Sequence, residues 1–194
     1  PEHQLNLDKF IARGGNLLIA GEPGRQDVMN QITAQFGVEM LPGRLVKPTE
    51  NFSLDFIMST PTKEGAEMMY QLNMMRNREY VLTMPGTTGL KYSHDKGYKV
   101  TELFVSDTSG GVWSEVETTN FVDDTVKVNA ALGEVVSASI PTVIALHRKV
   151  GDKEQKIVIL SDADCISNGE ISIMRKGVRA ANYNFIMGAF FWMS

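Results

Sequence analysis

The chain has 194 residues, with 19 Lys and Arg against 23 Asp and Glu, so its formal charge is −4 at pH 7. This charge balance argues against a dedicated nucleic-acid-binding protein, and 43% hydrophobic with 22% charged residues is typical of a globular domain. Cys165 is the only cysteine, which excludes an intrachain disulfide and every zinc site built on cysteine pairs.

Runs with helical and strand-like hydrophobic spacing alternate along the chain. Gly14 and Gly15 predict the end of the first helix, because glycine most easily adopts the left-handed turn that follows a helix. The apolar runs 16–21 and 156–160 are not interrupted by alternating polar residues, so we expect both strands to be buried on both faces. In chain order, the patterns predict a helix over 5–13, a strand over 16–21, a helix over 28–37, a strand over 52–59, a helix over 63–79 with a stripe of Met68, Met69, Met74 and Met75, a strand over 80–84, two strands over 142–150 and 156–160 joined by a turn, and a helix over 182–193.

The segment 86–133 differs from the rest of the chain. It is dense in Gly, Ser, Thr, Asp and Asn and has no sustained helical period, so we expect long loops or a peripheral hairpin there rather than core elements. The alternation elsewhere predicts a single α/β domain over 1–194. We expect three layers around a mostly parallel, doubly wound sheet, with 86–133 as a loop-rich insertion.

Motifs for nucleotide binding and catalysis are weak. The loop 21–24 joins a strand to a helix, but its glycines miss the dinucleotide-binding spacing and Glu22 would repel a phosphate. The sequence holds no P-loop, and its three histidines are isolated from one another. We therefore predict no catalytic residue, no cofactor and no metal, and a protein that is not an enzyme.

Cys165 follows the predicted strand 156–160, where open sheets place their binding crevices. The adjacent Asp164 disfavours the thiolate that would do the chemistry, and the small residues that usually flank a nucleophile are missing. We expect a buried, inert thiol.

The same run, 161–169, carries four polar side chains: Asp162, Asp164, Ser167 and Asn168. Their oxygens could bind a divalent cation or a small polar ligand. The same residue types also cap turns and helix starts by accepting hydrogen bonds from free N–H groups. We favour the capping role over a permanent metal site, and we keep these four as the candidate ligand-binding residues.

Three blocks of the sequence resemble one protein family. The blocks are 7–19, then 36–38 with 43–46, and finally 156–164 with Ser167, Asn168 and the segment 184–193. Together they resemble the auxiliary component of gliding-motility-type (GldG-like) ABC transport systems. The resemblance implies a bacterial, extracytoplasmic (periplasmic) domain similar to class I glutamine-amidotransferase-like folds, without their catalytic apparatus and tethered by membrane helices outside this sequence. Family members usually carry an aromatic residue where this chain has Cys165.

We therefore expect a non-catalytic sensing or scaffolding domain of a membrane transport system. Its partners would be permease and ATPase subunits, with a small polar ligand or a glycan as a further candidate and no nucleic acid. The alternative is a degenerate or active amidotransferase- or hydrolase-like enzyme that uses Cys165 or a cation at Asp162 and Asp164. A third hypothesis, a carbohydrate-binding module, needs exposed aromatic residues such as Trp113 and Tyr92 on one face.

Residues 185–193 are apolar almost all round, whereas a helix on one side of a soluble sheet needs only an apolar stripe. Phe190, Phe191 and Trp192 add aromatic rings of the kind found at the lipid headgroup layer. We expect this helix to lead into a membrane span in the full-length protein, with the domain outside the cytoplasm.

Overall fold

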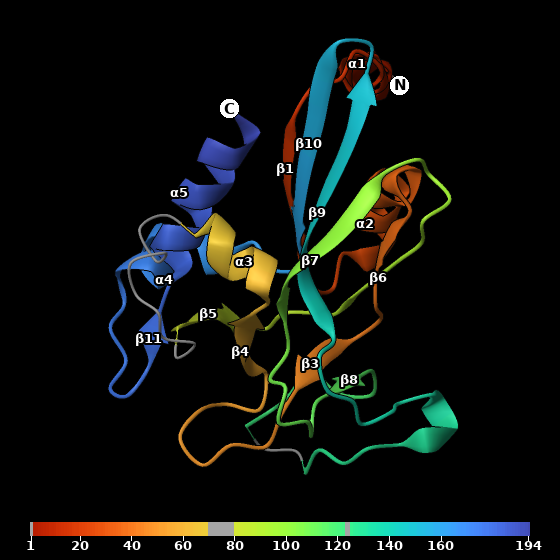
Figure 1. Cartoon of the computed structure of the whole chain (residues 1–194). Helices are drawn as coiled ribbons and strands as arrows, with labels where there is room; N and C mark the ends of the chain where they lie inside the picture. Colours follow the sequence, from red (N-terminus) through yellow and green to blue (C-terminus); the bar gives the residue numbers. More distant parts are fainter. Residues whose placement is uncertain (1, 70–79, 123–124) are drawn as a thin grey trace.

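A computed structural model describes residues 2–69, 80–122 and 125–194 of the chain. These residues form a seven-stranded sheet, two small two-stranded sheets and short helices (Figure 1). In spatial order, the large sheet contains β1 (Leu17–Ala20), β10 (Lys153–Leu160), β9 (Pro141–Val150), β7 (Lys99–Val105), β4 (Phe56–Pro61), β5 (Tyr80–Pro85) and β11 (Arg179–Ala180). The small sheets pair β2 (Val38–Met40) with β6 (Leu90–Tyr92), and β3 (Arg44–Val46) with β8 (Trp113–Glu115).

The helices lie around these sheets. The α-helices are α1 (Glu2–Ala12), α2 (Gln26–Thr33), α3 (Lys63–Met68), α4 (Asn168–Ser172) and α5 (Asn182–Met193). Three 3-10 helices are η1 (Ala34–Phe36), η3 (Ala130–Leu132) and η4 (Asp164–Ile166).

The strand directions contradict the expected fold class. Within the described part of the large sheet, β1–β10 and β5–β11 pair in parallel, and the other four pairings are antiparallel. The sheet is also strongly curled (Figure 1). The longest helix among the described residues, α5, has 12 residues. The prediction of a three-layer, mostly parallel, doubly wound sheet resembling class I glutamine-amidotransferase-like folds is therefore wrong. An apolar run indicates that both faces of a strand are covered, and it says nothing about the direction of the neighbouring strand.

The core lies on both faces of β10. Val158 and Leu160 belong to one cluster, together with Phe185 of α5. Ile157 and Ile159 belong to the opposite cluster, which includes residues of α1, η1, β2 and β6. The side chains of these four residues are fully buried and β10 lies between β1 and β9, so the prediction that 156–160 forms an inner strand is confirmed. The predicted hairpin between β9 and β10 is confirmed as well.

The first helix and strand were predicted in part. α1 ends just before Gly14, which has the left-handed φ of +80° that the sequence indicates. β1 lies at the edge of the large sheet and its residues are half-buried, so the expected burial on both faces is wrong for this strand. An edge strand has a neighbour on one side, which leaves its flank open to solvent.

The segment 86–133 contributes a strand to the middle of the large sheet. β7 lies between β9 and β4, and its residues Leu103 and Phe104 are buried. The expectation that this segment holds no core element is therefore wrong for β7. Only the second half of β7 is buried. The first half carries polar residues, so the strand has no continuous apolar run that would have predicted it. Gly65 allows α3 to pack closely here, because a Cβ at Gly65 would lie 1.9 Å from the carbonyl oxygen of Leu103.

The helix expected over 63–79 begins as predicted. Thr62 caps α3, and its Oγ1 accepts the N–H of Gly65 at 3.0 Å. Met69 already has an extended backbone, and Met68 and Met69 pack against the core. The remainder of that prediction, with Met74 and Met75, lies outside the described residues.

α5 matches the helix predicted over 182–193 at both ends. Phe185 and Ala189 are buried against the sheet, whereas Tyr183, Phe190 and Phe191 are exposed. Within the described ranges, no helix is both long and apolar enough to cross a membrane.

Candidate functional site

The loop after β10 lies at the carboxyl ends of two parallel strands, β1 and β10. Backbone hydrogen bonds join it to the loop after β1: Gly21 N donates to Leu160 O at 2.8 Å, and Ala163 N donates to Gly21 O at 2.7 Å. The buried Ser161 hydroxyl donates to the carbonyl of Thr142 on β9 at 3.0 Å. The predicted site residues therefore lie on a loop that is hydrogen-bonded to the loop after β1 and to β9.

Asp162 points into this junction and is 1% exposed. Its Oδ1 accepts the N–H of Asp164 at 2.8 Å, which is the turn-capping bond that the sequence favours. Its Oδ2 is buried with no hydrogen-bond partner among the described residues. Burial is the main reason that the pKa of Asp162 rises from 3.8 to about 7, and the charges of Asp164, Glu22 and Glu170 raise it further, against a lowering by the Asp164 N–H.

Cys165 lies in η4 with its side chain fully buried. Its thiol donates to the carbonyl oxygen of Asp162 at 3.1 Å. Burial raises the pKa of the thiol well above its usual value, and the charges of Asp162, Glu170 and Asp164 act in the same direction. A thiol that stays protonated and enclosed is a poor nucleophile.

The remaining predicted residues lie at the surface. Asp164, Ser167 and Asn168 are exposed, in contrast to Asp162. Ser167 caps α4, because its Oγ accepts the N–H of Glu170 at 3.1 Å, and Asn168 is the first residue of that helix. The structure thus joins Asp162 to Asp164 by a hydrogen bond and gives Ser167 a separate capping role. A ligand at these residues stays a prediction.

Glu170 has a larger role than its sequence position indicates. It is 7% exposed and forms a bidentate pair with Arg175, with Nη1–Oε1 at 2.5 Å and Nη2–Oε2 at 2.9 Å. It also accepts the hydroxyl of Thr83 on β5. The guanidinium of Arg175 lies over the ring of Phe56, 4.7 Å from its centroid. This buried ion pair ties α4 to β5 and β4.

Asn182 completes the junction from the start of α5. Its Oδ1 accepts the N–H of Thr83 at 3.1 Å, and its Nδ2 donates to the carbonyls of Thr83 at 2.9 Å and Cys165 at 2.7 Å. Sequence analysis named neither Asn182 nor Thr83. An Asn at the first position of a predicted helix is the signal that could have suggested a capping or bridging role.

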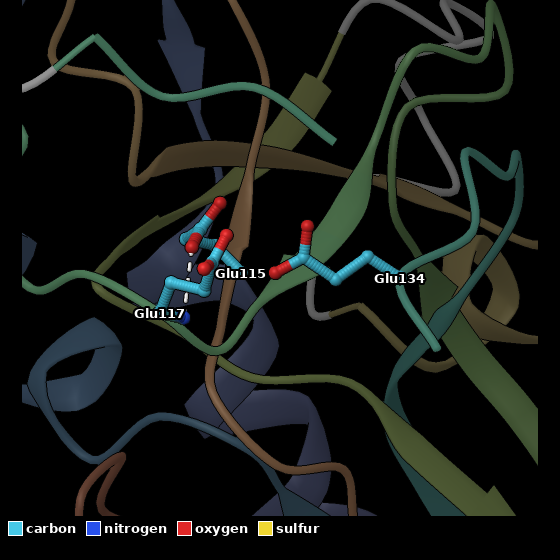
Figure 2. Close-up of side chains that lie close together, drawn as sticks. All are labelled: Glu115, Glu117 and Glu134. Atoms are coloured by element: carbon cyan, nitrogen blue, oxygen red, sulfur yellow. Dashed lines mark hydrogen bonds between the residues drawn. The ribbon is translucent and has the colours of Figure 1, made fainter. Parts of the chain in front are cut away.

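A second polar cluster gathers three glutamates, Glu115, Glu117 and Glu134, whose carboxylate oxygens lie within 4.8 Å of one another (Figure 2). Glu115 and Glu134 are 2% and 3% exposed, whereas Glu117 is exposed. Backbone N–H groups already bind the two buried carboxylates: Glu115 Oε1 accepts from Glu117 at 2.9 Å, and Glu134 Oε2 accepts from Asn129 at 2.7 Å. The cluster is therefore explained as a set of loop caps.

Sequence analysis missed this cluster. Glu115 and Glu134 are 19 positions apart in a segment without a clear period, so nothing in the sequence indicates that they meet. Trp113, considered above as an exposed aromatic, is 5% exposed and donates from Nε1 to Glu115 Oε2 at 3.2 Å. Tyr92 is half-buried and donates to Glu102 Oε1 at 2.8 Å. These positions give no support to a glycan-binding aromatic face.

The fold and the site define a mixed-sheet α/β domain in which polar side chains at the carboxyl ends of β1 and β10 hold the surrounding loops together. No model of a known protein family matches the chain, and no curated protein matches it. A solved structure titled "mmIFT52 N-terminal domain" is similar to it, with a TM-score of 0.56 at 12% sequence identity, over 97% of this chain and 69% of that chain. At this identity the likeness concerns the fold alone.

Proposed function

We propose that this chain is a non-catalytic sensing or scaffolding domain of a membrane ABC-type transport system. Its partners are the permease and ATPase subunits, and it acts on the extracytoplasmic side of the membrane. The sequence resemblance supports the transport system. The observation that carries the non-catalytic part is the environment of Cys165, whose thiol is fully buried and donates to the carbonyl of Asp162.

The polar residues around Cys165 support the same conclusion. Glu170 is engaged by Arg175, and Asn182 bonds to the backbone of Thr83 and Cys165. In a catalytic site, the nucleophile and its base lie within hydrogen-bond reach of each other and of a substrate. Here the side chains bind the protein's own loops, as a scaffold requires.

A thiol-labelling experiment tests the non-catalytic part. Because Cys165 is the only cysteine, all iodoacetamide labelling reports on this residue. We expect the folded protein to react far more slowly than the urea-unfolded protein between pH 7 and 9. Fast labelling of the folded protein, with an apparent pKa well below the ordinary value of about 8.5, would instead favour the enzyme alternative.

A purification experiment tests the partners. The full-length protein is tagged, expressed from its own locus and purified from membranes in mild detergent. We expect a permease and a P-loop ATPase to purify with it in constant ratio. Recovery of the protein alone, or its location in the cytoplasmic fraction, contradicts the proposal.

A further inference from the structure

A cavity of about 380 Å³ lies between α3 and the last turn of α5, two helices on the same side of the large sheet (Figure 1). Side chains of β7, β9 and β10 complete its lining. A volume of this order suits a small molecule. The described residues that line it include none from the junction around Asp162, so the cavity is a separate candidate site.

Basic side chains form a row along one side of the cavity. Lys99, His147 and Lys156 lie opposite one another across β7, β9 and β10. Lys156 Nζ donates to the carbonyl of Trp192 at 2.6 Å, and His147 contacts the carboxylate of Glu154. Lys99 is exposed and forms no ion pair with another described residue. The basic row therefore offers an anionic group a cation that the described part of the protein does not neutralise.

The floor of the cavity is made of small and apolar side chains. Thr101 and Ala145 lie opposite each other, two residues along β7 and β9 from the basic row, so their side chains share its face of the sheet. Ala145 and Leu103 are buried, and the half-buried Trp192 adds an aromatic wall from α5. An alkyl chain fits this floor, because it leaves water when it contacts these side chains.

Acidic side chains form the opposite side of the cavity. Glu64 and Glu67 are three positions apart on α3, so they lie on the same side of that helix. Gly65 between them packs against Leu103, four residues along β7 from the basic row, which is about 13 Å of strand. Glu67 has Lys63 at 3.9 Å, whereas Glu64 is exposed and forms no ion pair with another described residue. The cavity thus carries opposite charges on opposite sides of its floor.

We propose that this cavity binds an ω-amino carboxylate, an alkyl chain with a carboxylate at one end and an ammonium at the other. The carboxylate contacts the basic row, the chain lies over Thr101 and Ala145, and the ammonium contacts Glu64. A ligand with only one charge leaves the other side of the cavity without a partner or faces a like charge. The same chemistry occurs in free ω-amino acids and in a lysine that ends a peptide. The inference goes beyond the proposed function and does not depend on a transport system.

Calorimetric titration of the whole chain with 6-aminohexanoate tests the proposal. We expect a dissociation constant at or below about 1 mM, which a ligand of this size can reach. Hexanoate and hexylamine each lack one of the two charges, and we expect both to bind at least about tenfold more weakly. Equal affinity for all three compounds, or no binding of 6-aminohexanoate, overturns the proposal. Nα-acetyl-lysine mimics the end of a peptide. Tighter binding of this compound than of 6-aminohexanoate assigns the site to a peptide end, and weaker binding assigns it to a free ω-amino acid.

An NMR titration tests where the ligand binds. Trp192 lines the cavity, whereas Trp113, the other tryptophan, is buried and donates to Glu115. We expect 6-aminohexanoate to shift the indole N–H signal of Trp192 and to leave that of Trp113 in place. Binding that leaves the Trp192 signal unmoved overturns the assignment to this cavity.

Variants that each remove one charge test the roles of the two sides. Glu64→Gln and Lys99→Gln change exposed residues, and Glu50→Gln is the matched control at an exposed position that does not line the cavity. We expect the first two variants to weaken binding of 6-aminohexanoate several-fold and the control to leave it unchanged. Glu64→Gln should not weaken the binding of hexanoate, which has no ammonium. Unchanged affinity for 6-aminohexanoate in both cavity variants contradicts the proposal.

Discussion

At the residue scale, Asp162 gives the protein a pH dependence with a definite sign. Its pKa is about 7 in the folded state against 3.8 as the ordinary value. The folded state therefore binds more protons than the unfolded state between these pH values, and the free energy of unfolding falls as the pH rises through this window. The charged carboxylate is disfavoured because Oδ2 is buried and none of the described residues offers it a hydrogen bond.

The Asp162→Asn variant should remove this dependence. Asparagine keeps the oxygen that accepts the Asp164 N–H and cannot ionise. At pH 8 we expect the variant to be more stable than the wild type, by an amount of at most about 4 kcal/mol for a shift of about three pKa units. Near pH 4 the two proteins should differ little, because the wild-type carboxyl is then protonated when folded. Urea unfolding followed by circular dichroism at pH 4, 6 and 8 measures the difference. Asp152→Asn, at an exposed position in the turn between β9 and β10, is the matched control, and a gain that is constant from pH 4 to 8 would disprove the assignment.

At the element scale, the side chain of Gln155 links the end of α1 to the large sheet by hydrogen bonds. Gln155 on β10 is fully buried, and its Nε2 donates to the carbonyls of Ile11 and Gly15, both at 2.9 Å. Its Oε1 accepts from Tyr98 at 3.1 Å and from Arg148 at 2.6 Å. The bonds from Nε2 reach one carbonyl in the last turn of α1, where carbonyls lack partners within the helix, and one just beyond the helix.

Replacing Gln155 with leucine should destabilise the protein. The change removes a hydrogen bond from the carbonyls of Ile11 and Gly15 and from the buried hydroxyl of Tyr98, so we expect the free energy of unfolding to fall by roughly 2–4 kcal/mol. Urea unfolding gives this value. Trypsin should also cut sooner at Lys9 and Arg13, because α1 detaches more often. Lys153→Leu, at an exposed position of the same strand, should change stability little; an equal loss in both variants would mean that the hydrogen bonds of Gln155 are not responsible.

The sequence predicts elements here better than it predicts how they assemble. The helix at 182–193 and the hairpin of β9 and β10 follow from hydrophobic spacing and a glycine turn, which are local signals. The mixed strand order does not, because β10 is covered on both faces whether its neighbours are parallel or antiparallel. β7 was missed because half of its residues remain partly exposed.

The candidate site likewise combines a residue that the sequence predicts with contacts that it does not. Asp162 was found because a carboxylate directly after a buried strand stands out in the sequence. Its contacts with the loop of Glu22, and the bridge from Asn182 to Thr83, join residues about 100 or more positions apart. Pairings of this kind depend on the fold, which a single sequence does not reveal.

At the scale of the whole molecule, the structure divides into a core that covers both faces of β10 and a mostly irregular segment, residues 116–136, between β8 and β9. β10 lies between β1 and β9, and both of its faces are buried. The N–H bonds seen for the described residues in this segment run to Glu115 and Glu134 or close local turns, and none of these bonds pairs it with the large sheet. Opening of a region costs less free energy where few buried contacts are lost.

Hydrogen exchange should therefore distinguish the core strands, including β7, from the segment 116–136. We expect amides of β9, β10 and the second half of β7 to exchange most slowly, since they open only with the whole domain. Amides of residues 125–128 should exchange faster. The amides of Val116, Glu117, Thr118 and Asn129 should be slower than these, because their N–H groups bind the buried Glu115 and Glu134. Mass spectrometry of peptic fragments measures this contrast. If Leu103 and Phe104 exchanged as quickly as residues 125–128, β7 would not be part of the central sheet, and 86–133 would behave as the peripheral insertion that its composition suggests.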